Sequence, residues 1–182
     1  NKNTKINDIG KMKLGWWDIT NYDYKSKGAP GIIDLVYLFE HSSNIASIKI
    51  AQMMTSKEFY DSLKLFNFGE KTGIDLPGES AGLLPAPKNW DVATHGAMGY
   101  GYGASTTAIQ MIAAVSAIAN GGTLMKPYLI DSIENDDGAR IKKYSGKSYG
   151  NLMTAEEAQI LSDYMKGVCD YGTAARYFKK YD

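Results

Sequence analysis

The sequence predicts a mixed α/β (α+β) chain that is mainly helical and carries one small β-hairpin. Apolar residues recur at helical spacing within residues 105–120. Helix-start signals, a Thr followed three residues later by Glu or Gln, stand at positions 55, 107 and 154. Two strand-like runs, 124–133 and 139–144, flank the turn formers Asn135–Gly138. Together these patterns predict several helices and one hairpin.

The first third of the chain alternates between loops and apolar helices. Residues 1–30 are polar and predict irregular structure or short strands, while the apolar run 32–40 predicts a helix. The polar cluster His41–Asn44 follows, and Ser43 or Asn44 can cap the next helix, 45–54. Apolar residues nearly surround that helix, which predicts deep burial. A third helix begins near Thr55.

The remainder opens with a long loop and ends in helices. Residues 67–89 hold many Gly and Pro residues, and ordered loops of this length are usually functional or cover a core. A glycine-rich run, Gly99–Gly103, precedes the helix 105–120, and the last helix opens at Thr154. Helix 105–120 is the clearest in the sequence, because its apolar residues follow helical spacing, namely Ala108, Met111, Ile112, Val115 and Ala119.

Composition excludes several classes of protein. The 182 residues carry 20 basic and 20 acidic side chains, so no net charge favours nucleic acid or an anionic membrane surface. One Cys cannot form an internal disulfide, and two distant His residues cannot build a histidine-rich metal site. We expect no metal and no cofactor. Neither end has the signature of a natural terminus, so residues 1–182 are expected to be part of one domain, truncated at both ends.

The sequence Ser42-Ser43-Asn44 is the best candidate for chemistry. Between two apolar helices, Ser42 offers a hydroxyl that can pass a proton, and Asn44 offers a carboxamide that can orient a peptide group. Helix capping explains the same residues without any catalysis. The two His residues lack a partner arrangement typical of a catalytic triad. The run Gly99–Gly103 lacks the spacing of a nucleotide-binding loop.

The stretch Glu40–Ala51 resembles the sequence around the second active-site motif, Ser-x-Asn, of penicillin-binding proteins. The likeness continues in order through Phe66–Glu79, Gly82–Pro85 and Gly101–Gln110. It extends to Ala117–Gly122, Lys126–Pro127, Gly167–Val168 and Gly172–Thr173. Their collinear order resembles class B penicillin-binding proteins of the cell-division type.

This resemblance implies a serine D,D-transpeptidase that cross-links peptidoglycan through an acyl-serine intermediate and reacts with penicillin. It implies catalytic and substrate-binding roles for Ser42, in proton transfer, and for Asn44, in hydrogen bonding to the substrate peptide. Ser43, the middle residue, receives no role. The implied fold is a serine β-lactamase/penicillin-binding-protein-like transpeptidase fold. Here it would be mainly the helical lobe with a small hairpin, and the central sheet would be largely missing.

Two family motifs are absent from these residues. No Ser-x-x-Lys occurs in the sequence, so the nucleophile is expected before Asn1 and the catalytic Lys-Thr-Gly after Asp182. Lys71-Thr72-Gly73 matches that string, but it follows a loop rather than an apolar strand, and we interpret it as non-catalytic. We therefore expect the isolated chain to be inactive and to expose apolar surface where the sheet would pack.

The resemblance also implies partners and a location. Expected partners are peptidoglycan stem peptides ending in D-Ala-D-Ala, β-lactams, and other division or wall-synthesis proteins, with no nucleic acid. The expected location is the extracytoplasmic side of the cytoplasmic membrane, with roles in cell division and cell shape. Two alternatives stay open: a β-lactam- or wall-peptide-binding sensor without cross-linking activity, and a structural module in which Ser42 and Asn44 only cap a helix.

Overall fold

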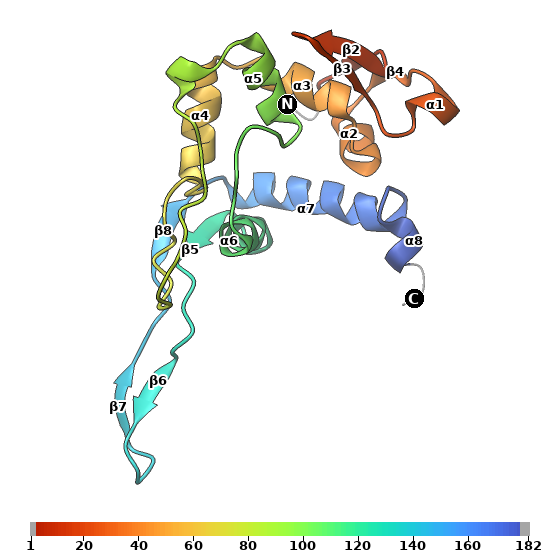
Figure 1. The fold of residues 1–182 in the computed structure, drawn as a ribbon. Helices are drawn as coiled ribbons and strands as arrows, with labels where there is room; N and C mark the ends of the chain where they lie inside the picture. Colours follow the sequence, from red (N-terminus) through yellow and green to blue (C-terminus); the bar gives the residue numbers. More distant parts are fainter. Residues whose placement is uncertain (1–2, 179–182) are drawn as a thin grey trace. The chain divides into compact units, whose positions relative to one another are not determined.

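The computed structural model describes residues 3–178. The expectation that the domain is truncated at both ends concerns chain ends that lie outside the described residues. Figure 1 shows the helices and strands in chain order. The chain divides into two compact units. Unit 1 comprises Asn1–Asp61, Pro85–Ala104 and Ile160–Asp182, and unit 2 comprises Ser62–Leu84 and Ser105–Gln159. Helices α4 (Ser56–Leu65) and α7 (Ala155–Asp170) each contribute residues to both units.

Two small antiparallel sheets open unit 1. Strand β1 (Ile6–Asp8) pairs with β4 (Gly31–Ile33), and β2 (Lys11–Leu14) forms a hairpin with β3 (Trp17–Thr20). A one-turn helix, α1 (Tyr24–Lys27), lies between β3 and β4. The prediction of short strands in the first thirty residues is therefore confirmed.

The first long helix begins later than its apolar run suggests. Helix α2 spans Leu35–His41, because the Asp34 carboxylate accepts a hydrogen bond from the Tyr37 N–H at 3.0 Å and caps the helix there. The preceding Ile32 and Ile33 pair with β1 instead. The prediction that the helix begins at residue 32 was wrong, because Ile32 and Ile33 are β-branched residues that pair in a strand.

Helix α3 (Asn44–Ala51) forms the centre of unit 1. Ile45, Ala46 and Ile48 are fully buried, so the predicted deep burial is confirmed for these turns. The predicted end at residue 54 was wrong, because the helix ends at Ala51 and Met53 beyond it is 64% exposed. Beside it lies α5 (Val92–Gly99), a helix that the sequence did not predict because two of its eight residues are glycine. A Cβ on Gly99 would lie 2.6 Å from the Ala51 Cβ, so this glycine permits the close approach of the two helices.

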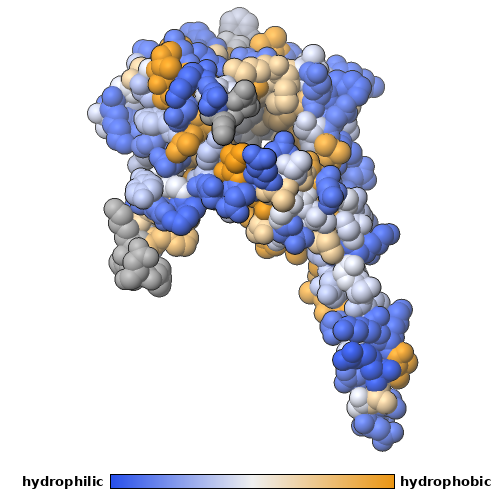
Figure 2. Space-filling model, turned by 180° about the vertical axis from the view of Figure 1, so that it is seen from behind, coloured by the Kyte–Doolittle hydropathy of each residue, from blue (hydrophilic) through white to orange (hydrophobic). Residues whose placement is uncertain are grey.

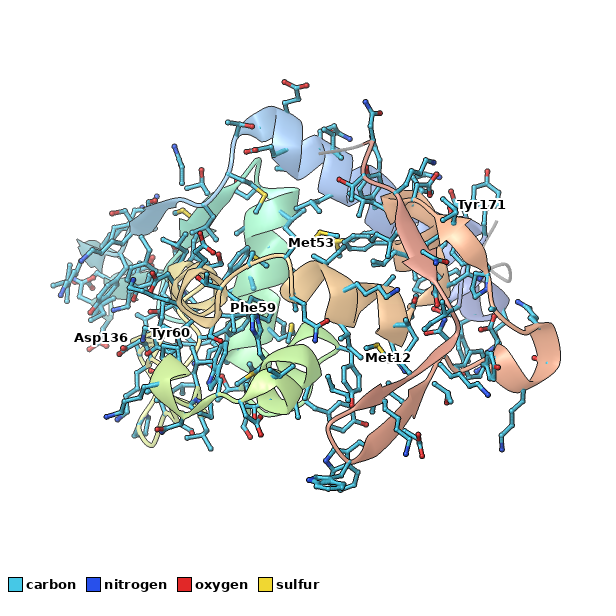
Figure 3. The ribbon with its side chains drawn as sticks, turned by 90° about the horizontal axis from the view of Figure 1, so that it is seen from above. Met12, Met53, Phe59, Tyr60, Asp136 and Tyr171 are labelled. Atoms are coloured by element: carbon cyan, nitrogen blue, oxygen red, sulfur yellow. The ribbon has the colours of Figure 1, made fainter. Side chains whose placement is uncertain are left out.

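Aromatic side chains pack where α4 meets α5. Phe59 and Tyr60, both labelled in Figure 3, project from α4. The Phe59 ring lies 6.2 Å from the Trp90 ring and 5.7 Å from the His95 ring, between centroids. Trp90 follows the 3-10 helix η1 (Pro87–Asn89) and donates its indole N–H to the Pro85 carbonyl. The short helix α8 (Ala175–Phe178) ends the described part of the unit.

Unit 2 is built around α6 (Ala108–Ala119), which starts with the predicted capping box of Thr107 and Gln110. Strand β5 (Thr123–Met125) pairs with β8 (Ser148–Asn151), and β6 (Ser132–Glu134) pairs with β7 (Arg140–Lys143). Figure 2 shows the β6–β7 hairpin as mostly hydrophilic. The described residues thus hold four two-stranded sheets and no larger sheet.

The predicted strand 124–133 is two strands with a break. Pro127 has no N–H to donate to a sheet. The N–H groups of Leu129 and Ile130 donate to the Asp75 carboxylate at 2.7 and 3.0 Å, so they are not used in strand pairing. The single-strand prediction was therefore wrong, while the turn at Asn135–Gly138 is confirmed by a hydrogen bond from the Gly138 N–H to the Asn135 carbonyl.

The apolar residues whose spacing predicted α6 do not form its buried face. Gln110, Ala114 and Ala117 are buried, whereas the residues of the spacing pattern are exposed, with Met111, Ile112 and Val115 as its large side chains. The reason is that Gln110 hydrogen-bonds two carbonyls of the long loop and turns its own side inward. No helix within residues 3–178 combines the length and the apolar character needed to cross a bilayer.

Candidate active site

The Ser42–Asn44 turn joins α2 to α3, and each of its residues belongs to a helix or to a helix cap. Ser42 is the C-cap of α2 and has left-handed backbone angles, φ 51° and ψ 51°. Ser43 is the N-cap of α3, and its Oγ accepts a hydrogen bond from the Ala46 N–H at 3.0 Å. Asn44 is the first residue of α3. The packed helices on both sides therefore hold the three side chains in fixed directions.

The middle side chain points inward and its two neighbours do not. Ser43 is 2% exposed and donates its hydroxyl proton to the Asp8 carboxylate at 2.5 Å. Ser42 is exposed and Asn44 is partly exposed. Both line a groove of about 480 Å³, together with His41, Tyr171, Thr173 and Arg176. All residues that line this groove belong to unit 1.

Asn44 still has hydrogen-bonding capacity on the groove side. Its Nδ2 donates to the Thr20 carbonyl at 2.9 Å. Within residues 3–178, neither Asn44 Oδ1 nor the Ser42 hydroxyl has a hydrogen-bond partner. Asn44 also borders a second, aromatic groove of about 710 Å³ that contains Trp17 and Tyr102. The turn therefore carries one hydroxyl and one carboxamide oxygen without a partner in the described residues, on side chains that line a groove.

The far wall of the first groove comes from the end of the chain. Tyr171, labelled in Figure 3, lies just past the end of α7. The Thr173 N–H donates to the Glu40 carbonyl at 2.9 Å, and a Cβ on Gly172 would lie 2.3 Å from the same oxygen. This close backbone contact holds the Gly172-Thr173 segment against the end of α2. No local pattern in the sequence identifies Gly172-Thr173 as part of a groove, since its only signal there is the family resemblance.

Charged and aromatic groups surround the groove. Lys27 and Asp23 form an ion pair at 3.2 Å, and the Arg176 guanidinium lies 4.6 Å from the centre of the Tyr177 ring. The His41 ring stacks on Tyr37 with centroids 4.0 Å apart. Burial, and then the negative charge of Asp23, raise the pKa of the Tyr37 phenol, which therefore stays neutral at physiological pH.

The sequence Lys71-Thr72-Gly73 is held in unit 2 by an acidic side chain. The Thr72 and Gly73 N–H groups and the Thr72 hydroxyl all donate to the Glu79 carboxylate. Burial raises the pKa of Glu79, but these hydrogen bonds outweigh it and lower the pKa overall. The Thr72 carbonyl accepts from the Tyr149 hydroxyl at 2.6 Å. These contacts hold Thr72 and the Gly73 N–H inside unit 2, which favours the interpretation of the string as non-catalytic.

Neither His residue offers a metal site. Residues 3–178 contain no group of three His, Cys, Asp or Glu side chains placed to hold a metal ion. His95 is buried, with its Nδ1 atom 3.3 Å from the Ser56 hydroxyl and its Nε2 atom without a hydrogen-bond partner. Cys169 is a partly buried free thiol on α7.

Two residues that the sequence did not single out contact the turn from behind. The Asp8 carboxylate accepts from Ser43, and Asn21 donates its side-chain amide to both Asp8 oxygens at 3.0 and 2.8 Å. Asp8 has no exposed surface and Asn21 is 5% exposed. Asp residues are rarely buried completely. In the sequence Asp8 is a single acidic residue close to Gly10, and nothing in that pattern indicates that it is buried.

The whole chain, residues 1–182, matches the family model described as the penicillin-binding protein transpeptidase domain. The penicillin-binding protein PbpB of Mycobacterium tuberculosis is 33% identical over 131 residues, which are 72% of this chain and 19% of that protein. Stage V sporulation protein D of Bacillus subtilis is 29% identical over 153 residues, 84% of this chain and 24% of that protein.

Solved structures of related proteins share the fold. Penicillin-binding protein 3 of Mycobacterium tuberculosis, crystallised with aztreonam, has a TM-score of 0.80 and 26% identity over 94% of this chain and 38% of its own. The D,D-transpeptidase domain of a peptidoglycan glycosyltransferase from Eggerthella lenta has a TM-score of 0.79 and 25% identity, over 94% of this chain and 44% of its own.

This chain belongs to the penicillin-binding protein transpeptidase family, as part of the transpeptidase domain of a class B member. Its helices and strands form part of the mixed α/β fold of that domain. It spans about a fifth to a quarter of the curated relatives just described.

Proposed function

We propose that the full-length protein is a serine D,D-transpeptidase that cross-links peptidoglycan stem peptides and is acylated by β-lactams. The observation that carries this proposal is the turn at Ser42–Asn44. It carries a hydroxyl and a carboxamide oxygen, both without a protein partner in the described residues, on two residues that line one groove in a chain of this family. The Ser-x-Asn sequence alone is compatible with helix capping, whereas this geometry favours ligand binding.

The proposed reaction needs a nucleophilic serine, and none in this sequence stands in a Ser-x-x-Lys motif. In the full-length protein, that serine attacks the carbonyl between the two D-Ala residues of a stem peptide, and the terminal D-Ala leaves with the proton. The amine of a second stem peptide then attacks the acyl-serine. A new amide forms, and the serine recovers its proton.

Ser42 and Asn44 have distinct roles in this scheme. The Ser42 hydroxyl both accepts and donates, so it passes a proton between the nucleophile and the leaving or attacking nitrogen. The Asn44 carboxamide hydrogen-bonds the backbone of the stem peptide, and its anchoring to the Thr20 carbonyl fixes the direction of Oδ1. We place the protein on the extracytoplasmic side of the cytoplasmic membrane, with a role in cell division and other wall-synthesis proteins as partners.

A fluorescent penicillin tests the proposal in the full-length protein. The wild type is expected to form a stable covalent adduct, and Asn44→Ala is expected to lose at least about 90% of the acylation rate. Its melting temperature should fall only slightly, because one hydrogen bond, to the Thr20 carbonyl, is lost. The isolated chain 1–182 is expected to stay unlabelled. Failure of the wild-type protein to label, with its fold intact, would refute the proposal.

A second measurement separates transpeptidation from sensing. A labelled D-Ala-D-Ala stem peptide is offered to the full-length protein together with an amine acceptor, and the cross-linked product is followed by mass spectrometry. A transpeptidase releases D-Ala and forms the new amide bond. Stable acylation by penicillin without any cross-linked product would instead identify the sensor alternative.

A further inference from the structure

A buried carboxylate lies directly behind the Ser42–Asn44 turn. Asp8, the last residue of β1, is 0% exposed. Three groups donate to it: the Gly10 N–H at 2.8 Å, the Asn21 side-chain amide, and the Ser43 hydroxyl at 2.5 Å. No ion pair to Asp8 is found among the described residues. A buried carboxylate satisfied by neutral donors holds those donors firmly, since bonds to a charged acceptor are shorter and stronger than neutral ones.

These bonds reach the backbone of the first turn of α3. The Ser43 hydroxyl, which donates to Asp8, accepts from the Ala46 N–H. Asn21 Oδ1, on a side chain that also bonds Asp8, accepts from the Ile45 N–H at 3.1 Å. The turn is therefore tied to a single carboxylate through two separate routes.

The same contacts set the direction of the functional side chains. Because the Ser43 side chain points into the network, Ser42 and Asn44 on either side of it are left to face the groove. The Asn44 amide is also held by the Thr20 carbonyl, and Thr20 is the neighbour of Asn21. The position of Asn44 Oδ1 therefore depends on the position of Asn21, which depends on Asp8.

We propose that Asp8 is a positioning residue for the transpeptidase reaction, which acts through Asn21 and Ser43 to orient Ser42 and Asn44. This inference rests on the proposed function, since it assigns a role within the same site. It gives Ser43, the middle residue of the motif, a defined function as the link between the buried carboxylate and the turn.

The test measures acylation kinetics in the full-length protein. Time courses with fluorescent penicillin at several concentrations give the acylation rate constant, and their amplitudes give the fraction of competent molecules. In Asp8→Asn, an amide NH₂ replaces one acceptor oxygen and faces the donors of the network. We expect the rate constant to fall about tenfold or more, because small misplacements of reacting groups are costly. A merely structural role would lower only the amplitude and the melting temperature.

Two Ser43 variants test the same network in case Asp8→Asn does not fold. Ser43→Ala removes the link to Asp8 and is expected to lower the rate constant as Asp8→Asn does. Ser43→Thr keeps a hydroxyl that can make both bonds and is expected to stay within about threefold of the wild-type rate constant. The matched control is Gln110→Met, which removes a buried hydrogen-bonding side chain from unit 2 and should reduce stability without changing the rate constant.

The outcomes separate this inference from the proposed function. If the wild type is not acylated, the proposed function fails. If the wild type is acylated but Asp8→Asn and Ser43→Ala keep its rate constant, the positioning role is overturned and the network serves stability alone. A slower rate constant in both variants, with Ser43→Thr and Gln110→Met close to the wild type, supports the inference.

Discussion

Replacing Ser42 by glycine should separate the stability of the turn from its chemistry. Ser42 adopts φ 51° and ψ 51°, a left-handed conformation that costs a residue with a Cβ roughly 1 kcal/mol. Glycine adopts it without that cost but loses roughly 0.5–1 kcal/mol more backbone entropy on folding. The Ser42 side chain has no hydrogen-bond partner in the described residues, so nothing else is lost. The free energy of unfolding of Ser42→Gly should therefore match the wild type within about 1 kcal/mol.

Activity should respond very differently. Proton transfer by a positioned side chain contributes about 100-fold or more to a rate. We therefore expect Ser42→Gly to lower the rate constant for acylation by fluorescent penicillin by about 100-fold, at an unchanged melting temperature. Ser42→Ala is the matched control, because it lacks the hydroxyl but keeps the left-handed cost, and its rate should fall equally. A Ser42→Gly protein that is acylated at the wild-type rate would refute the proton-transfer role.

Three further predictions concern stability in the full-length protein. Gln110→Met removes three hydrogen bonds, two to loop carbonyls and one from the Thr107 N–H. The free energy of unfolding, measured in urea, should therefore fall by about 3 kcal/mol, and a fall below about 1 kcal/mol would contradict the prediction. Gly99→Ala gains helix propensity of about 1 kcal/mol but places its Cβ 2.6 Å from the Ala51 Cβ, so calorimetry should show a net lower melting temperature rather than a higher one. Because hydrogen bonds lower the pKa of Glu79 below its ordinary 4.5, its contribution to stability is present above that pH and is lost as the pH falls through the lower, folded-state value. Melting temperatures measured from neutral to acid pH should therefore fall less steeply in Glu79→Gln than in the wild type.

The parts of the fold that the sequence could predict are those fixed by neighbouring residues. The capping boxes that begin at Thr55, Thr107 and Thr154 are present, because each needs only a side chain three residues away. The Asn135–Gly138 turn is present for the same reason. Local hydrogen bonds of this kind need no knowledge of the tertiary structure.

The parts that were wrong depend on residues far away in the chain. The strand expected over 124–133 breaks where two N–H groups donate to Asp75, more than 50 residues earlier. Helix α5 was missed because Gly99 argues against a helix by propensity, yet its lack of a Cβ is what lets the helix contact α3. The spacing of apolar residues does not reveal the buried face of α6, because Gln110, a polar residue, faces the loop.

The candidate site divides in the same way. Ser42 and Asn44 could be found because they lie together in one short motif. Asp8 and Asn21 could not, since they are 35 and 22 residues from Ser43 and form no recognisable spacing with it. A single sequence shows neither that Asp8 is buried nor that its donors come from three segments. Thr173, in the far wall of the groove, is even farther from the motif along the sequence.

The structure also weighs against the alternative in which Ser42 and Asn44 only cap a helix. The side chain that caps α3 belongs to Ser43, whose Oγ accepts from the Ala46 N–H. Capping therefore explains the middle residue of the motif and leaves its two neighbours unexplained. A C-cap in the left-handed conformation favours glycine or asparagine, yet a serine with an unused hydroxyl occupies this position. Asn44 bonds the Thr20 carbonyl through its side-chain NH₂ group, so its side-chain oxygen makes no hydrogen bond within the described residues. If the triplet served the fold alone, Ser43 would suffice. The groups that face the groove are therefore better explained by a ligand than by packing.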